Sequence, residues 1–161
     1  MTATAQNGWA MSVTRHIAAP PHHVWHIMTA RQAEWYCPLP WLAEVIFKDW
    51  RAGGRDAMLF RGPNGEEMPQ EGLFLEVVPG VRWVSTDAFV RAADGNFMPT
   101  SPFMVGCWEI KAEGEGTLYT ATARHWDEDA AKRHIDMGFE DGWGACADQL
   151  KTLCEAASGE R

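Results

Sequence analysis

The hydrophobic pattern of this chain changes its period once, and that change constrains the fold more than any other feature. Between residues 42 and 126, apolar and polar residues alternate in short runs separated by turn signals, which is typical of antiparallel strands. From residue 127 to 157 the apolar residues recur with the period of a helix. The pattern therefore predicts a series of strands followed by one long C-terminal helix.

The strands of this series are bounded by Gly-, Pro- and Asn-containing turns. They are expected at residues 42–50, 55–62, 71–78, 81–89, 103–111 and 117–126. One more strand is expected at 11–19, followed by a short helix at 20–29 and a second short helical turn at 31–35. An antiparallel sheet must cover its apolar face, and the C-terminal helix is the only predicted element large enough. We therefore expect an α+β fold with a curved seven-stranded antiparallel sheet wrapped around this helix.

The C-terminal helix has a clear start and an unusual interior. Asp127 is a suitable N-cap, and the acidic residues that follow suit the positive end of the helix dipole. Gly138, Gly142 and Gly144 each cost about 1 kcal/mol relative to Ala inside a helix, which implies a kink or a close approach of another element. The expected apolar face consists of Ile135, Phe139, Trp143, Cys146, Leu150, Leu153 and Cys154.

Composition and charge exclude several functions. A net charge of −8, with basic residues scattered along the chain, argues against binding of nucleic acid or an anionic membrane surface. Nine Trp, eight Met and seven Phe provide large side chains that suit a wide core or an apolar cavity. No apolar run is long enough to span a membrane, and no signal peptide is recognised. These features predict a cytoplasmic protein with one domain.

The four cysteines and six histidines give no metal or redox motif. No pair of cysteines has C-x-x-C spacing, so we expect reduced thiols that behave as buried apolar residues. His22 and His26 have an i, i+4 spacing that can bind zinc, but no third ligand is evident, so a solvated helix face is expected. His16, His125 and His134 are isolated in the sequence. We expect neither a metal nor a cofactor.

The order of elements and several motifs resemble the START-like, helix-grip superfamily, also called SRPBCC. Within it the chain is similar to the branch of the C-terminal domain of activators of the 90-kilodalton heat-shock chaperone ATPase. The motifs that carry the resemblance are "IAAPPHHVWHIMT", "EWY", "AGGR", "FRGPNGEE", "EGLFLEVVPGVRWVSTDAF" and "MGFEDGWGACADQLKTL". The resemblance implies a START-like domain at 11–156. The small and polar residues before it predict a disordered N-terminus at 1–10, and a flexible tail is expected at 157–161. The resemblance also implies a small apolar ligand or a chaperone as partner, and leaves a homodimer open.

The segment "EWYCPLPW", residues 34–41, departs from this family. The family usually has two adjacent tryptophans where this chain has Trp35 and Tyr36, and here two prolines follow. The prolines predict a stiff loop. In this fold the loop lies at the mouth of the cavity, which would place Trp35 and Trp41 at its rim. The full-length eukaryotic activators also carry an N-terminal domain that this sequence does not contain, which argues against ATPase stimulation.

Strand alternation then predicts which side chains face the helix. Glu109 should point outward, which sends Met104, Gly106, Trp108 and Ile110 inward. The small residues Gly106, Ala121 and Ala123 leave volume under the helix, although a filled core is the alternative. The expected ligand-binding residues are Trp35, Trp41, Met58, Phe60, Trp83, Asp87, Phe89, Met104, Trp108, Tyr119, Met137, Phe139 and Trp143.

Asp87 and Glu71 are the candidates for polar chemistry. An inward Asp87 could act as a general base or anchor a ligand hydroxyl, or it could lie in solvent or cap the following segment. Glu71 could share a proton with Asp87, unless Arg55 or Arg82 neutralises either acid. Three hypotheses follow: binding of an apolar ligand, an enzyme (a cyclase, hydrolase or isomerase of an apolar substrate) that uses these acids, and a protein-interaction module.

Overall fold

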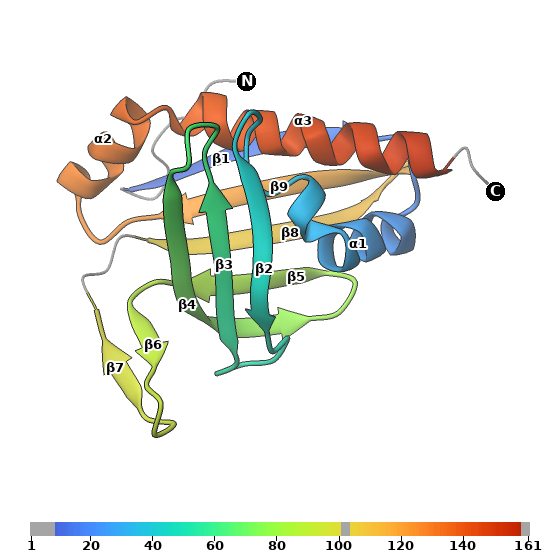
Figure 1. Cartoon of the computed structure of the whole chain (residues 1–161). Coiled ribbons are helices and arrows are strands. Elements are labelled where there is room, and N and C mark those ends of the chain that lie inside the picture. Colours follow the sequence, from blue (N-terminus) through green and yellow to red (C-terminus); the bar gives the residue numbers. More distant parts are fainter. Residues whose placement is uncertain (1–8, 101–103, 159–161) are drawn as a thin grey trace.

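The computed structural model describes residues 9–100 and 104–158, and its main element is one antiparallel sheet (Figure 1). Seven strands form this sheet: β1 (Ala10–Ile17), β2 (Leu42–Lys48), β3 (Arg55–Arg61), β4 (Glu67–Val78), β5 (Arg82–Thr86), β8 (Val105–Glu113) and β9 (Gly116–Arg124). Their order across the sheet is β1-β9-β8-β5-β4-β3-β2. All pairs are antiparallel, so the predicted seven-stranded α+β architecture is confirmed.

Four helical elements accompany the sheet: α1 (Pro21–Ala30), the 3₁₀ helix η1 (Gln32–Glu34), α2 (Glu128–Asp136) and α3 (Phe139–Ser158). The helix α3 packs against β1 and α1, and Figure 1 shows it lying along one side of the curved sheet. Pro21 occupies the first turn of α1, where its missing N–H costs no hydrogen bond. The two short helices predicted after the first strand are therefore present, and the fold is a helix grip. No helix among the described residues is long and apolar enough to cross a membrane.

The core lies between the sheet and the helices α1 and α3. The alternation on β8 and β9 follows the prediction: Trp108 and Ile110 are buried, whereas Glu109 is exposed. From the helix α3 the core takes Phe139, Ala147, Leu150 and Cys154, which are fully or almost fully buried. The expected helix face is therefore largely confirmed.

The expected continuous C-terminal helix is broken at Gly138. Asp127 caps α2, because its Oδ1 accepts a hydrogen bond of 2.8 Å from the N–H of Ala130. Gly138 then has a φ of +95°, which ends α2 and lets α3 start in a new direction. This break explains why Ile135, expected on the buried face, is exposed: it belongs to a separate helix with its own orientation.

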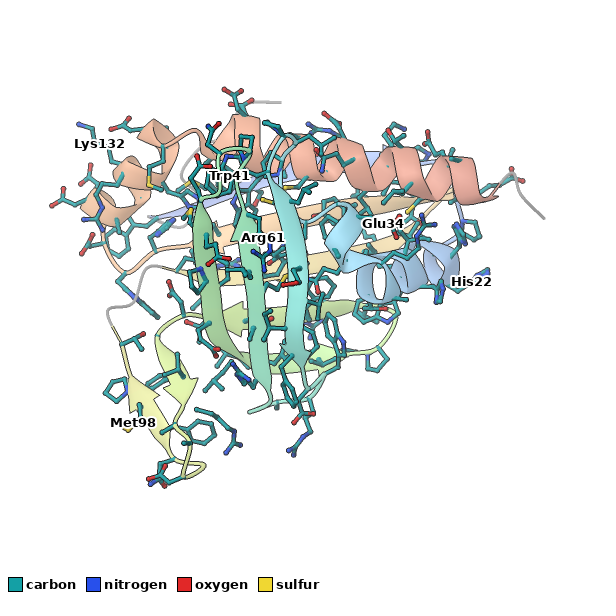
Figure 2. All side chains as sticks on the ribbon, in the orientation of Figure 1. His22, Glu34, Trp41, Arg61, Met98 and Lys132 are labelled. Atoms are coloured by element: carbon teal, nitrogen blue, oxygen red, sulfur yellow. The ribbon has the colours of Figure 1, made fainter. Side chains whose placement is uncertain are left out.

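The hairpin that lies outside the seven-stranded sheet was not predicted. The strand expected at 81–89 ends at Thr86, and the chain continues into β6 (Phe89–Arg91), which pairs with β7 (Phe97–Pro99). Gly95, with a φ of +88°, makes the turn between them. Figure 1 shows this hairpin away from α3, and Met98 points from it away from the rest of the protein in Figure 2. The segment between the strands expected at 81–89 and 103–111 therefore contains a separate two-stranded sheet.

The expected terminal segments fall mostly outside the described residues. The predicted disordered N-terminus includes residues 1–8 and the predicted tail includes 159–161, which the structure does not describe. Within the described part, β1 starts at Ala10 and α3 extends to Ser158.

Two substitutions test the break between α2 and α3. Gly138→Ala should lower the free energy of unfolding by about 1–2 kcal/mol, because the left-handed conformation is costly for a residue with a Cβ. Gly142→Ala should raise it by up to about 1 kcal/mol, because Gly142 lies inside α3 and its Cβ would contact only the Pro38 ring, at 4.0 Å. Urea unfolding of both variants measures the two effects. Equal effects of the same sign would contradict this account.

Candidate functional site

A cavity of about 330 Å³ opens between the sheet and the N-terminal part of α3. It receives side chains from the loop after η1, from strands β3, β4, β5, β8 and β9, from the residues just after β5 and just before β8, and from both sides of the α2–α3 break. The lining residues are Trp35, Tyr36, Pro38, Asp56, Met58, Phe60, Met68, Gln70, Glu71, Gly72, Ser85, Thr86, Asp87, Met104, Trp108, Tyr119, His134, Met137, Gly142, Trp143 and Cys146. The lining is mostly apolar, with a few polar groups at defined positions.

A stack of three indole rings supports one wall of the cavity, which two of them, Trp108 and Trp143, line. Trp83 on β5 stacks on Trp108 on β8, with ring centroids 5.5 Å apart, and Trp108 stacks on Trp143 on α3 at 5.4 Å. Gly106 provides the room that the middle ring needs, since a Cβ there would lie 2.4 Å from the ring of Trp108. The stack therefore connects two strands to the helix and fixes the distance between them.

Gln149 on α3 fastens the aromatic loop at residues 34–41 to the helix. Its Nε2 donates to the carbonyl oxygens of Trp35 and Cys37, at 3.2 and 2.9 Å, and its Oε1 accepts from the N–H of Leu39 at 3.1 Å. Trp35 is thereby held almost fully buried, with its ring edge-on to the rings of Tyr36 and Tyr119. The loop is thus part of the cavity wall.

Asp87 lines the cavity and also supports the backbone. Its Oδ1 accepts a hydrogen bond of 3.2 Å from the N–H of Met104, and the hydroxyl of the adjacent Thr86 donates to the Met104 carbonyl at 3.0 Å. These bonds join the end of β5 to the chain that enters β8. The two predicted roles of Asp87, a cap and an inward polar group, are therefore both compatible with its position.

The other two carboxylates of the wall form ion pairs with cations outside it. Arg55 donates to both carboxylate oxygens of Glu71, at 2.5 and 3.2 Å, and the pair is exposed. Arg82, the other expected partner, instead pairs with Glu76. Asp56 pairs with Lys48, and this pair is largely buried. Arg55 therefore neutralises Glu71, which was the alternative to a proton shared between Glu71 and Asp87.

His134 is a cavity residue that the sequence did not reveal. It comes from α2, and its Nδ1 lies 2.9 Å from Nε2 of His125, in a hydrogen bond between two buried side chains. Burial lowers the pKa of His134 to about 4, and the neighbouring His125 contributes to this shift. His134 is therefore neutral at physiological pH. The two histidines were expected to be isolated, because nine residues and a helix start separate them in the sequence.

Two phenols and a thiol complete the polar part of the wall. Burial raises the pKa of Tyr36 and of Tyr119 well above the usual range, so both keep the proton on the hydroxyl. Burial also raises the pKa of Cys146 to about 12, which keeps the thiol protonated and a poor nucleophile. This agrees with the expectation that the cysteines are buried apolar residues.

The structure brings most of the predicted ligand-binding residues to this cavity and places four elsewhere. Trp83 and Phe139 are fully buried in the core behind the wall. Phe89 is exposed at the start of the β6–β7 hairpin. Trp41 packs against Gly62 in the β3–β4 turn, since a Cβ added at Gly62 would lie 2.9 Å from the Trp41 ring. Figure 2 shows Trp41 at the end of these two strands. The remaining predicted residues line the cavity together with Glu71.

No metal centre is found in the part of the chain that the structure describes. Within residues 9–100 and 104–158, no group of three or more His, Cys, Asp or Glu side chains is arranged to hold a metal ion. His22 and His26 are both exposed on α1, and Figure 2 shows His22 at the surface. Their position fits the solvated helix face that was expected.

Comparisons with known proteins give the same fold. A family model described as "Activator of Hsp90 ATPase homolog 1-like protein" matches residues 18–155. A crystal structure of a protein from Nitrosomonas europaea is 31% identical, with a TM-score of 0.86, and the match covers 96% of this chain and 99% of that chain. A crystal structure from Mycobacterium smegmatis is similar in fold, with 21% identity, a TM-score of 0.80 and 98% coverage of both chains. A comparison with curated proteins gave no match.

Gln149→Leu tests whether the hydrogen bonds of Gln149 hold the loop at residues 34–41 against α3. This change keeps the side chain similar in size but leaves one N–H and two carbonyl groups of the loop without their partner. We expect the free energy of unfolding to fall by about 1–3 kcal/mol, and the amide of Leu39 to exchange its hydrogen faster. Thr152→Ala, on the exposed side of the same helix, is the control and should change stability by less than about 0.5 kcal/mol. An unchanged exchange rate at Leu39 would show that Gln149 does not hold the loop.

The buried histidine pair predicts a dependence of stability on pH. The unfolded chain protonates His134 near pH 6.5, whereas the folded protein does so only near pH 4. The stabilisation is therefore complete above pH 6.5 and is lost as the pH falls from 6.5 to 4, by roughly 2–3 kcal/mol.

Urea unfolding of the wild type and of His134→Gln over this pH range measures the effect. The stability advantage of the wild type over the variant should shrink as the pH falls. His26→Gln, at an exposed position on α1, should show no such trend. An advantage of the wild type that stays constant from pH 7 to pH 4 would show that His134 is not buried in its neutral form.

Proposed function

The chain belongs to the family of Activator of Hsp90 ATPase homolog 1-like proteins, and from this premise we propose that it binds a small, mostly apolar molecule in the cavity between the sheet and α3. The observation that carries the proposal is the cavity itself. Its volume of about 330 Å³ lies at the lower end of the range for small-molecule sites, and its lining combines apolar rings with a few polar groups. The ligand is accordingly a compact molecule.

The physical reason for binding is the area of apolar surface that a ligand would remove from water. Six aromatic rings line the cavity: those of Tyr36, Phe60 and Trp143 are partly exposed, whereas those of Trp35, Trp108 and Tyr119 are almost fully buried behind them. Burying apolar surface contributes about 25 cal/mol per Å², and the rigid rings lose little conformational freedom on binding. A ligand therefore gains most of its affinity from contact with these rings, and orientation from the polar groups beside them.

The polar groups of the wall support binding more directly than they support catalysis. Asp87 accepts a backbone hydrogen bond, and Arg55 donates to both oxygens of Glu71. Neither arrangement prepares a general base in the way that a shared proton would. We therefore propose Asp87 as the polar anchor of a bound molecule. The enzyme hypothesis stays the alternative, and measured turnover of such a molecule would establish it.

A protein-interaction role is a second candidate, and the family description supports it. The matching model is named for activators of the Hsp90 ATPase. A pull-down with the chaperone tests this role, and absence of retention would count against it. Binding of a small molecule and binding of a chaperone are separate properties, because the first depends on the cavity wall and the second on the outer surface.

The ligand-binding proposal is tested by filling the cavity from one position. Gly142 lines the cavity, and a Cβ at this position meets only the Pro38 ring at 4.0 Å, so Gly142→Phe should project a ring into the mouth. We expect the neutral fluorescent probe N-phenyl-1-naphthylamine to bind the wild type saturably and to bind Gly142→Phe at least about tenfold more weakly, a loss of about 1.4 kcal/mol.

Gly142→Ala is the matched control, since it adds only a methyl group at the same place. It should bind the probe within about twofold of the wild type. Thermal unfolding followed by circular dichroism verifies that each variant is folded, and native mass spectrometry of freshly purified wild type searches for a co-purified ligand. Equal affinity of the wild type and Gly142→Phe would show that the probe does not enter the cavity, and would contradict the proposal.

A further inference from the structure

The charge of the cavity wall restricts the kind of molecule that it can hold. Three carboxylates, those of Asp56, Glu71 and Asp87, belong to the wall, and the first two pair with Lys48 and Arg55, which lie outside it. No Lys or Arg is found among the described residues that line the cavity. The one histidine of the wall, His134, is neutral at physiological pH for the reason given above. A ligand carboxylate or phosphate would thus enter a space without a cationic partner, which is unfavourable away from water.

The aromatic rings of the wall also favour a cation over an anion. The face of an aromatic ring carries a partial negative charge, which attracts a cation and repels an anion. Both faces of Trp108 are covered, because it stacks between Trp83 and Trp143. The rings of Tyr36 and Phe60 are partly exposed on the same wall, with centroids 6.3 Å apart. Tyr36 and Tyr119 are neutral phenols, so they add rings without adding a charge.

The protein itself holds one ammonium group in these surroundings. The Nζ of Lys48 lies 5.8 Å from the ring centroid of Tyr36, 5.5 Å from that of Trp50 and 5.7 Å from that of Phe74. It also pairs with Asp56, and both Tyr36 and Asp56 belong to the cavity wall. The rings alone do not keep this ammonium group charged. Burial lowers the pKa of Lys48, whereas the ion pair with Asp56 raises it. An ammonium group here requires rings together with a carboxylate.

Asp87 can supply that carboxylate to a ligand. It lies on the cavity wall next to the buried hydroxyls of Ser85 and Thr86. One of its oxygens accepts the N–H of Met104. A carboxylate has about four acceptor positions, so a bound ammonium can share Asp87 with the groups of the protein that it already contacts.

We propose that the ligand is a cationic amine with an apolar, ring-sized body, whose ammonium group binds beside Asp87 and the partly exposed rings of the wall. This inference rests on the proposed function, since it specifies the ligand of the same cavity. Apolar acids and phosphate esters are excluded by the same features of the wall. Neutral molecules of the same shape bind, but more weakly than the amine.

Three probes that share one apolar body separate the contribution of charge from that of shape. They are 1-naphthylmethylamine, which is a cation at pH 7, 1-naphthylmethanol, which is neutral, and 1-naphthoate, which is an anion. Isothermal titration calorimetry with the wild type should give about tenfold tighter binding of the amine than of the alcohol. The acid should bind at least about tenfold more weakly than the alcohol.

Asp87→Asn tests the anchor. The Asn side chain keeps an oxygen that can accept the N–H of Met104, so the connection between β5 and β8 is preserved. We expect the amine to lose about tenfold in affinity and the alcohol to stay within about twofold of the wild type. Asp136→Asn, at an exposed position at the end of α2, removes the same charge from the surface and should leave all three affinities unchanged.

The outcomes distinguish this inference from the proposed function. If the alcohol binds in the cavity and the amine binds no better, the cavity holds apolar molecules but the preference for a cation is wrong. Tighter binding of the acid than of the amine, or an equal loss of all three probes in Asp87→Asn, overturns it as well. If none of the probes binds, the proposed function fails together with the inference. Should Asp87→Asn not fold, the order of the three probes on the wild type decides alone.

Discussion

The stack of Trp83, Trp108 and Trp143 is the contact on which the rest of this structure depends. It runs from the sheet to α3 through rings separated by about 5.5 Å, and thereby sets the distance between the two layers. Smaller side chains would let the helix settle onto the sheet. Three indoles in a line hold it away and leave the cavity beside them. Gly106, Ala121 and Ala123 do not line this cavity: the Trp108 ring occupies the space above Gly106, and both alanines are buried in the core. The cavity is thus a consequence of how the core is packed.

Much of this arrangement could be predicted from the sequence, because it follows from local patterns. The alternation on β8 and β9 gave the buried positions of Trp108, Tyr119 and Ala121, and the resemblance to a helix-grip family gave the order of the elements. The turn between β3 and β4 was equally clear from "GPNG", since Gly65 adopts a φ of +88° there. Where a residue's environment depended on its neighbours in sequence, the prediction was sound.

The missed features depend on contacts between distant segments or on competition between two local patterns. His134 and His125 meet only because Gly138 ends α2 and directs the helix against the end of β9, and no periodicity carries this information. The hairpin β6–β7 had a signal in "ADGN", an Asp-Gly turn, but the apolar run that precedes it favoured one long strand. Gln149 could not have been assigned from the sequence, because a polar residue on a helix gives no indication of which loop it binds.

The rigidity of the cavity differs from one end to the other, and this bears on what it can bind. At the inner end, the indole stack and the Gln149 hydrogen bonds hold Trp35 and Trp108 in fixed positions. At the mouth, the wall consists of Met68 and Met137, both exposed and with flexible thioether side chains that adapt to different shapes. We expect the rigid inner wall to select for ring geometry, and the methionines to tolerate variation in the rest of a bound molecule. Under the proposed function, the cavity would accept a class of ligands that share the end held by the rings and differ at the other end.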